Sequence, residues 1–152
     1  MAKVTVYTDG SAKGNPGNGG YGAVLIAGNH QKELSGGFVL TTNNRMELMA
    51  VIAALEAMKS IGTEVTVYSD SKYVVDSVEK KWVFNWQKKG FKGKKNIDLW
   101  KRFLEVYSKH DVKFIWVKGH AGNHYNEICD QLAVSAAEGN DLQSDVGYKK
   151  EA

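Results

Sequence analysis

The sequence predicts an α/β protein built on a sheet of mixed strand direction, with helices on its flanks. Two observations support this class: short segments rich in Val, Ile, Thr and Tyr alternate with segments rich in Ala, Leu and Met, and five of the short segments have the length of strands. The 152 residues suit one domain with its own core, and we see no linker. We therefore expect a single domain over residues 1–152, with a polar, frayed C-terminal tail at about 139–152.

The N-terminal third predicts three strands, at 3–8, 21–28 and 32–40. The first two are separated by the turn-rich stretch "GSAKGNPGNGG" at 10–20, and the second and third by a turn near Gly28-Asn29. Because the connections carry no helical pattern, we expect an antiparallel meander. The stretch "GNGGYG" matches a dinucleotide-binding pattern, but it leads into a strand and not into a helix, which argues against that function.

A change of period and composition predicts a helix at about 44–60, with Thr42 or Asn43 near its N-terminal cap and Gly62 just after its end. The fourth strand follows at 64–69. A strand–helix–strand passage favours parallel pairing through a right-handed crossover. We expect the partner of this strand to be the first one.

The second half predicts a short helix at about 71–79, a basic segment at about 80–95 and a helix at about 96–108. The fifth strand is "VKFIWV" at 112–117. A loop, "KGHAGNHY", leads to a final helix at about 126–137. The expected sheet therefore has five strands.

One pentapeptide is nearly repeated: "TVYTD" at 5–9 and "TVYSD" at 66–70. Each copy reads as a strand that ends in a carboxylate. If the two strands are parallel neighbours, Asp9 and Asp70 leave the sheet at the same edge, where two carboxylates repel unless a cation lies between them. The alternative is that both Asp side chains only cap turns.

Glu47 is placed unusually for a carboxylate. Residues advance about 100° each along a helix, so Arg45, Glu56 and Lys59 share the expected solvent face and Glu47 lies on the opposite side. A carboxylate on the core side needs a partner or a metal ion. The alternative is an acid that only stabilises the start of the helix.

Two further candidates depend on their surroundings. Asp130 lies between the apolar and polar sides of the last helix, and it is a candidate site residue only if the fold brings it close to the other three acids. His120 lies between small residues in a loop, where we expect it to be accessible and able to titrate near neutrality. Neither His120 nor His124 has the Cys partners or the helical spacing of a zinc site, so we reject one.

The charge is unevenly distributed. Residues 80–95 hold seven Lys and no acid, whereas the remainder carries 13 basic and 17 acidic residues. This pattern predicts an acidic partner held at one place. Trp82 and Trp86 alternate with the lysines, so flat apolar surfaces accompany the phosphate-binding charges, although some of these aromatics can pack on the body. The lone Cys129 and the absence of a signal-like or membrane-spanning stretch favour the cytoplasm.

Together, the stretches "YTDGSAKGNPGNGGYG", "TTNNRMELMA", "YSDSKYVV" and "GHAGNHYNEICDQLA" resemble the type 1 ribonuclease H family, close to its bacterial ribonuclease HI members, over nearly the whole chain. The resemblance implies a ribonuclease H-like fold, with a five-stranded mixed sheet flanked by helices. It also implies a metal-dependent endonuclease that hydrolyses the RNA strand of RNA–DNA hybrids and leaves 5′-phosphate and 3′-hydroxyl ends. A non-catalytic hybrid-binding module and a DNA-cutting relative of the same fold are the alternatives.

The resemblance implies a site of four carboxylates, Asp9, Glu47, Asp70 and Asp130, which binds two Mg²⁺ ions, with Mn²⁺ as a substitute. Asp9 would bridge both ions. Glu47 and Asp70 would help to hold the ion on the leaving-group side, and Asp130 the ion on the nucleophile side. His120 would handle the proton of the attacking water or assist product departure.

The resemblance also implies substrate contacts. Short amides would reach the minor groove, where 2′-hydroxyls distinguish RNA from DNA. Lys72 stands where Gln is common in the family, and the basic segment would hold the DNA strand. The candidate substrate-binding residues are Asn15, Thr42, Asn43, Asn44, Lys72, Trp82, Trp86, Lys88 and Lys89. The expected partner is an RNA–DNA hybrid, with no membrane and no obligate protein partner, bound by a monomer.

Overall fold

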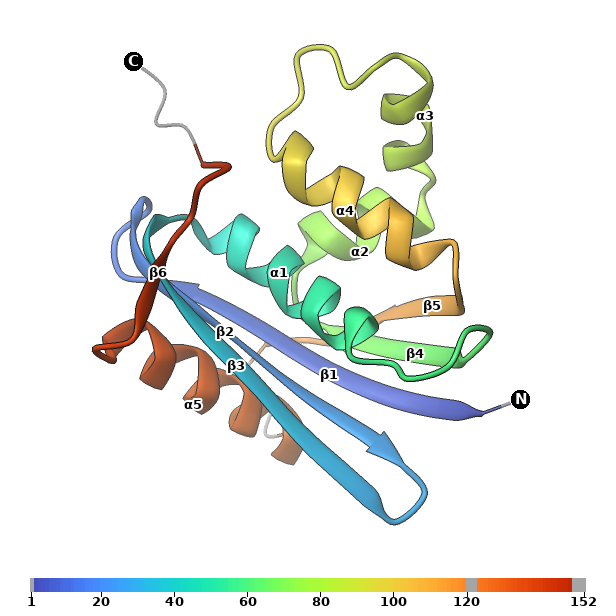
Figure 1. Ribbon diagram of the computed structural model, residues 1–152, viewed down its shortest axis with the longest axis horizontal. Coiled ribbons are helices and arrows are strands. Elements are labelled where there is room, and N and C mark those ends of the chain that lie inside the picture. The colour runs from blue at the N-terminus through green and yellow to red at the C-terminus, as the bar shows by residue number, and fades with distance from the viewer. Residues whose placement is uncertain (1, 120–122, 149–152) are drawn as a thin grey trace.

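The computed structural model describes residues 2–119 and 123–148. A single mixed sheet has the strand order β5-β4-β1-β2-β3-β6. Figure 1 shows helices on both of its faces. The elements are β1 (Lys3–Ala12), β2 (Gly17–Ala27), β3 (His30–Thr41), α1 (Asn43–Glu56), β4 (Glu64–Ser69), α2 (Lys72–Glu79), α3 (Trp82–Lys88), α4 (Ile97–Tyr107), β5 (Asp111–Trp116), α5 (His124–Glu138) and β6 (Leu142–Ser144).

The predicted meander is confirmed, because β1 pairs antiparallel with β2, and β2 with β3. Both strands of the first pair are longer than the sequence indicated. β1 runs on to Ala12 and β2 begins at Gly17, so the expected loop at 10–20 shrinks to a tight turn that contains a cis Asn15-Pro16 bond. Local propensity missed these ends because their glycines are extended by pairing across the ladder and not by their own preference.

The parallel pairing of β1 with β4 is also confirmed. Tyr7 lies opposite Tyr68 in this register, and the two rings stack with centroids 4.9 Å apart. The two copies of the repeated pentapeptide therefore lie side by side and in step. As a result, Asp9 and Asp70 lie at the same end of two neighbouring strands.

Helices α1, α2 and α4 cover one face of the sheet and α5 covers the other (Figure 1). The core between α1, α4 and the sheet is apolar and includes fully buried Leu48, Ile52, Val67, Trp100 and Phe103. On the other face α5 comes very close to β2, since a Cβ at Gly22 would lie 2.4 Å from the carbonyl oxygen of Cys129. Only glycine allows this approach, which brings the middle of α5 to the sheet.

The expectation of five strands is wrong, and so is the expectation of fraying for the part of the tail that the structure describes. Leu142–Ser144 form a sixth strand, which pairs in parallel with β3. A three-residue strand is too short to leave a period in the sequence. In addition, α1 ends at Glu56 rather than near residue 60, and the basic segment contains a helix of its own, α3.

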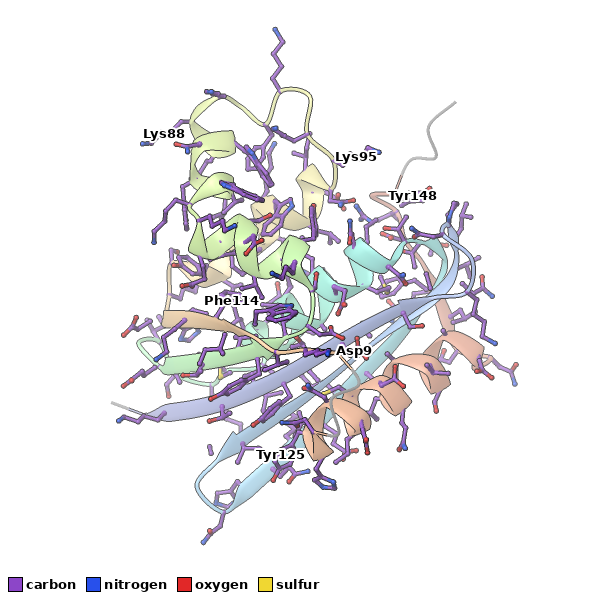
Figure 2. The ribbon with its side chains drawn as sticks, turned by 180° about the vertical axis from the view of Figure 1, so that it is seen from behind. Asp9, Lys88, Lys95, Phe114, Tyr125 and Tyr148 are labelled. Atoms are coloured by element: carbon purple, nitrogen blue, oxygen red, sulfur yellow. The ribbon has the colours of Figure 1, made fainter. Side chains whose placement is uncertain are left out.

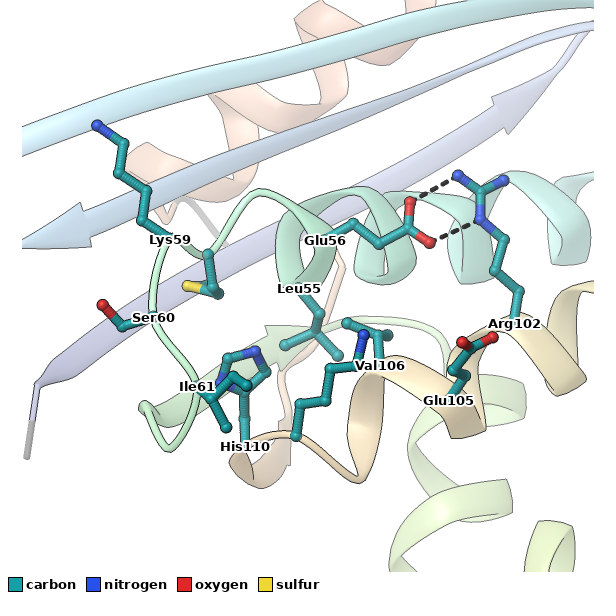
Figure 3. A pocket seen from close by; sticks show the side chains of 11 residues that line it. Leu55, Glu56, Lys59, Ser60, Ile61, Arg102, Glu105, Val106 and His110 are labelled. Carbon is teal, nitrogen blue, oxygen red and sulfur yellow. Dashed lines mark hydrogen bonds and ion pairs between the residues drawn. The ribbon is translucent and has the colours of Figure 1, made fainter.

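A cavity of 330 Å³ lies between the C-terminal end of α1 and α4. Its rim carries the ion pair of Arg102 with Glu56, whose two N–O distances are 2.6 and 2.7 Å (Figure 3). Glu47 lies in the first turns of the same helix, at the other end, so this cavity is separate from the carboxylates. Among the helices that the structure describes, none is long and apolar enough to cross a bilayer.

Candidate active site

Three carboxylates converge at one edge of the sheet. Asp9 lies on β1, Asp70 directly follows β4, and Glu47 reaches the same point from α1. One oxygen atom of each lies within 4.8 Å of the others. The approach of α1 depends on Gly10, since a Cβ there would lie 2.3 Å from the backbone nitrogen of Glu47. The structure therefore confirms that Asp9 and Asp70 lie close together and that Glu47 points inward toward them.

The crowding of these acids alters their proton affinity. Burial, followed by the charge of Asp70, raises the pKa of Asp9 to about 8, although the Gly10 N–H donates to its Oδ1 at 2.8 Å and opposes the shift. Burial and the neighbouring charge of Asp9 raise the pKa of Glu47 well above its usual range. Without a cation the cluster therefore holds protons at neutral pH, which a bound metal ion would displace.

Two oxygens of this cluster are buried acceptors without a hydrogen-bond donor among the described residues, as a cation-binding site requires. Glu47 Oε1 and Asp70 Oδ1 are shielded from solvent and accept no hydrogen bond from the described part of the protein. Leaving such acceptors unpaired costs free energy. Divalent hard cations prefer carboxylate oxygens. The donor set therefore fits a metal ion of the Mg²⁺ class.

Asp130 comes from α5, on the opposite face of the sheet from α1. It lies near enough to Asp9 for its charge and a hydrogen bond to contribute to the raised pKa of Asp9. It does not join the three acids whose oxygens lie within 4.8 Å of one another. The fourth predicted carboxylate is thus at the border of the cluster, on the side of Asp9.

His120, for which a catalytic role is predicted, lies outside the described residues. The loop that leads to it nevertheless passes directly against the site, because a Cβ at Gly119 would lie 2.8 Å from Asp70 Oδ2. A larger residue at this position would therefore press on the carboxylate of Asp70.

A tryptophan that the sequence analysis did not single out supports Asp70. The indole Nε1 of Trp116, at the end of β5, donates to the carbonyl oxygen of Asp70 at 3.1 Å. The ammonium of Lys72 lies 4.5 Å from the centroid of the Trp116 ring. Trp116 is 43% exposed, and the available signal was an aromatic at the end of the predicted fifth strand, next to the loop that carries His120. Trp116 therefore contacts both the backbone of Asp70 and the predicted substrate-binding residue Lys72.

A second feature adjoins the N-terminus of α1, where a pocket of 690 Å³ opens. Three predicted substrate-binding residues line it: Asn15, Thr42 and Asn44. The other walls, which no sequence pattern indicated, come from the end of the basic segment, the start of α4 and the C-terminal tail. These residues are Lys94, Lys95, Asn96, Gly147 and Tyr148. We call this cavity the amide–lysine pocket.

Three of the predicted substrate-binding residues, Asn15, Thr42 and Asn43, also make hydrogen bonds within the protein. Asn43 Oδ1 accepts from the Ala12 N–H at 2.6 Å, and Asn15 Oδ1 accepts from the Asn43 N–H at 3.0 Å. Thr42 is the N-cap of α1, since its Oγ1 accepts from the Arg45 N–H at 3.2 Å. The turn between β1 and β2 is thereby fixed to the start of α1.

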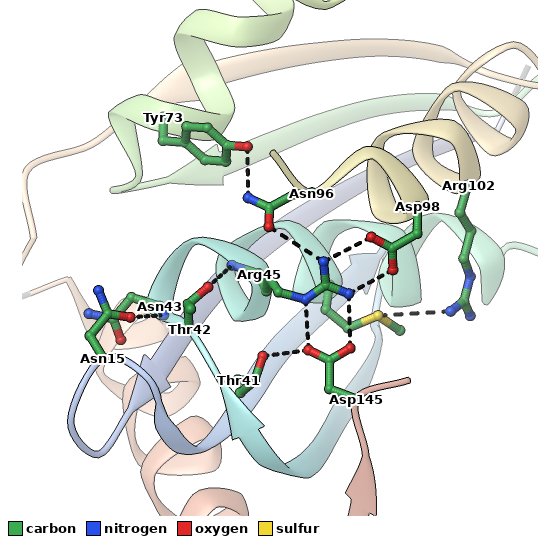
Figure 4. A network of polar contacts seen from close by, with 11 residues as sticks. Asn15, Thr41, Thr42, Asn43, Arg45, Tyr73, Asn96, Asp98, Arg102 and Asp145 are labelled. Atoms are coloured by element: carbon green, nitrogen blue, oxygen red, sulfur yellow. Dashed lines mark hydrogen bonds and ion pairs between the residues drawn. The ribbon is translucent and has the colours of Figure 1, made fainter. Parts of the chain in front are cut away.

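Arg45 is not on the solvent face as the helical period indicated, but is only 1% exposed. Its guanidinium makes ion pairs with Asp98, at 2.7 Å, and with Asp145, also at 2.7 Å (Figure 4). These acids lie 53 and 100 residues further along the chain. A solvent face is inferred from charge, and the tertiary partners that allow a charge to be buried are invisible to that rule.

Comparison with known proteins identifies the family. The ribonuclease H family model matches residues 1–138. The chain belongs to the ribonuclease H family. The prediction of such an enzyme, made from spaced motifs, is thereby confirmed.

Curated relatives agree. The ribonuclease H of Rippkaea orientalis is 54% identical over 152 residues, which cover 97% of this chain and 93% of the relative. Among solved structures, LC9-RNase H1, described as a type 1 RNase H with the type 2 active-site motif, has a TM-score of 0.83 at 34% identity, covering 95% of this chain and 75% of that one. LC11-RNase H1, solved in complex with an RNA/DNA hybrid, has a TM-score of 0.66 at 26% identity, covering 89% and 96%.

In this member of the ribonuclease H family the basic segment projects from the helices. Figure 2 shows Lys88 and Lys95 on that projection, above the sheet that carries Asp9. Trp86 packs inward, with its ring edge-on to Trp100 at 5.9 Å between centroids, whereas Trp82 is 43% exposed. The aromatics thus divide into one that anchors the segment and one that remains at the surface.

Proposed function

We propose that the chain is an endonuclease that hydrolyses the RNA strand of RNA–DNA hybrids. One observation carries the proposal: one carboxylate oxygen each of Asp9, Glu47 and Asp70 lies within 4.8 Å of the others, and Glu47 Oε1 and Asp70 Oδ1 are shielded from solvent without a hydrogen bond from the described residues. Such a cluster is costly unless it binds a cation. Membership of the ribonuclease H family supports the substrate class, and one related structure contains an RNA/DNA hybrid.

The cofactor we propose is a pair of Mg²⁺ ions held by Asp9, Glu47, Asp70 and Asp130. When bound, they would supply an activated water and stabilise the leaving oxygen of an in-line displacement, giving 5′-phosphate and 3′-hydroxyl ends. Asp70 and Asp130 both contribute to the raised pKa of Asp9, which supports a role for Asp9 in holding both ions. The chain's own contribution is to hold these carboxylates crowded and partly desolvated before the metal arrives.

Fixed backbone supports this arrangement. Asp70 is held through its carbonyl oxygen by Trp116 and lies against the loop at Gly119. Ser71 caps α2 by accepting from the Val74 N–H at 3.3 Å, so the chain turns sharply just after Asp70. A catalytic group on such a turn has little freedom to move, which suits chemistry that depends on geometry.

Hybrid recognition is proposed to use two surfaces. The amide–lysine pocket offers short amides, through Asn15 and Asn44, and cationic side chains to a sugar–phosphate backbone. The projecting basic segment offers Lys88, Lys89 and the exposed ring of Trp82 to the DNA strand. We further propose that the protein acts as a monomer in the cytoplasm.

The test uses end-labelled RNA in three forms: annealed to DNA, single-stranded, and annealed to RNA. Each is incubated with Mg²⁺, with Mn²⁺ or with a chelator. We expect cleavage of the hybrid alone, only with a divalent metal ion, and products whose ends are 5′-phosphate and 3′-hydroxyl. Asp70→Asn should retain the circular dichroism spectrum and lose turnover.

Two results would contradict the proposal. Equal cleavage of duplex RNA would refute hybrid selectivity. Tight binding of the hybrid without cleavage in either metal would indicate a binding module, even though all four carboxylates are present.

A further inference from the structure

The C-terminal tail is part of the wall of the amide–lysine pocket. β6 pairs with β3, and the chain then returns to α1 and α4, where Gly147 and Tyr148 line the pocket. The side chain of Asp145 is only 9% exposed. Figure 4 shows Asp145 reaching Arg45 from below while Asp98 reaches it from α4. Acidic side chains are seldom buried unless they are paired, so the burial of Asp145 against Arg45 shows that the tail makes a specific contact with the body of the protein.

Arg45 lines the same pocket, but its donors are all in use. Its Nε and Nη2 donate to the two Asp145 oxygens at 2.7 and 2.9 Å. Its Nη1 and Nη2 donate to the two Asp98 oxygens at 2.8 and 2.7 Å, and Nη1 also donates to Asn96 Oδ1 at 3.4 Å. A guanidinium has five N–H groups. Arg45 therefore has none left for a phosphate and serves as a connector.

The connector joins three of the pocket's four walls. Arg45 itself belongs to the first turn of α1, Asn96 and Asp98 to the start of α4, and Asp145 to the tail. Asp145 also accepts from the Thr41 hydroxyl at 2.6 Å, which ties in the end of β3. Asn96 in turn donates to the Tyr73 hydroxyl at 3.0 Å, which fixes its amide plane. The fourth wall, at Asn15, is bound through the Asn43 N–H.

We propose that Asp145 is a positioning residue for nucleic-acid binding: through Arg45 it holds the amide–lysine pocket in the shape that receives the backbone of the hybrid. The proposal rests on the hybrid binding proposed above. It assigns the C-terminal tail to the substrate-binding machinery, although the tail carries no residue of the carboxylate cluster. Its ligand is a phosphodiester backbone, recognised by the amides and lysines that the connector arranges.

Charge alone predicts the opposite effect of removing Asp145. Loss of an acid raises the net charge from +3 to +4 and, by simple electrostatics, should tighten binding to a polyanion. If Asp145 positions the pocket, its loss should weaken binding instead. The sign of the change therefore separates the two accounts.

The experiment measures hybrid affinity and turnover of the full chain. Asp145→Asn is nearly isosteric, but it places an amide NH₂ where Arg45 or Thr41 donates. Dissociation constants for the hybrid are measured with Ca²⁺ in place of Mg²⁺, well below the melting temperature of each variant. Asp141→Asn is the matched control, since Asp141 is an exposed acid in the same tail and gives the same change in net charge.

We expect Asp145→Asn to weaken hybrid binding about tenfold, which corresponds to about 1.4 kcal/mol, and to raise KM while kcat stays within about twofold. Asp141→Asn should bind as well as the wild type or slightly better. Asn44→Ala combined with Asp145→Asn should weaken binding less than the sum of the single changes, because both act on one pocket.

A lower melting temperature with unchanged hybrid affinity and KM would overturn the proposal and leave Asp145 a purely structural residue. Equal behaviour of the Asp145 and Asp141 variants would overturn it as well. A wild-type chain that bound no hybrid would refute the proposed function and this inference together, whereas binding that depends on Asn44 but not on Asp145 would refute this inference alone.

Discussion

Gly10 sets the distance between the strand that carries Asp9 and the helix that carries Glu47, and its replacement by alanine tests how closely the site depends on that distance. The added Cβ would lie 2.3 Å from the backbone nitrogen of Glu47 and 2.4 Å from the carbonyl carbon of Met46. Both are backbone atoms, so no side chain can rotate away. To reach an ordinary contact of 3.4 Å, strand and helix must separate by about 1.1 Å, the difference between 3.4 and 2.3 Å.

Two consequences follow for Gly10→Ala. Overpacking of this kind costs about 1–3 kcal/mol of unfolding free energy, which urea titration with a chelator present can measure. Glu47 must also move by about the same distance from Asp9 and Asp70, and misplacement of a catalytic group by ~1 Å can cost about 100-fold in rate. We therefore expect kcat on the hybrid to fall about 100-fold and the Mg²⁺ concentration at half-maximal rate to rise.

Gly139→Ala is the matched control. Gly139 has a φ of −74°, which any residue adopts, and a Cβ there meets only ordinary contacts at 3.4 and 3.5 Å. We expect this variant to keep the stability and kcat of the wild type. If Gly10→Ala kept kcat within threefold and the same urea midpoint, then α1 would be free to shift without disturbing the site, and the reasoning from this contact would fail.

The remaining predictions concern the surroundings of the carboxylates. Because the pKa of Asp9 is raised to about 8, the native state holds a proton that the unfolded state releases above about pH 4, so unfolding free energy without metal should fall as pH rises. Between pH 5 and 7 we expect a loss on the order of 3 kcal/mol, since each pH unit contributes about 1.36 kcal/mol for one proton, and Asp9→Asn should flatten this slope; an unchanged slope in urea titrations would contradict the assignment. Trp116→Phe keeps an aromatic ring but removes the indole N–H that donates to the Asp70 carbonyl, so calorimetry should show Mg²⁺ affinity weakened about threefold to tenfold. Ser71→Ala removes the cap of α2 and should cost about 1 kcal/mol in urea unfolding; no loss would mean that the cap is replaced by another acceptor.

The sequence was sufficient for the parts of the site that local pattern and topology determine. The repeated pentapeptide, together with one intervening helix, predicted the parallel pair of β1 and β4 and the meeting of Asp9 with Asp70. The helical period alone predicted that Glu47 points inward. These features depend on neighbours in the chain or on a single crossover, so they leave a signal that periodicity can detect.

The sequence was insufficient where distant segments meet. Arg45 was assigned to the solvent because its partners, Asp98 and Asp145, lie far along the chain. The tail was expected to fray because its three-residue strand has no period, yet β3 supplies its hydrogen-bond partners. Lys94 was predicted only as part of the basic segment and Asn96 only as the start of the following helix, and the fold places both in the wall of the amide–lysine pocket. In each case a tertiary partner overrides a local expectation.

The register that pairs Tyr7 with Tyr68 determines when, during synthesis and folding, the carboxylate cluster can assemble. Asp9 is synthesised early, but its nearest acidic partners arrive only with α1 and after β4, and Asp130 only with α5. A slip of one residue between β1 and β4 would turn one of the two acids to the wrong face of the sheet. A nascent or misregistered chain therefore lacks the assembled cluster, and the capacity to cut nucleic acid appears only when the domain has closed on itself.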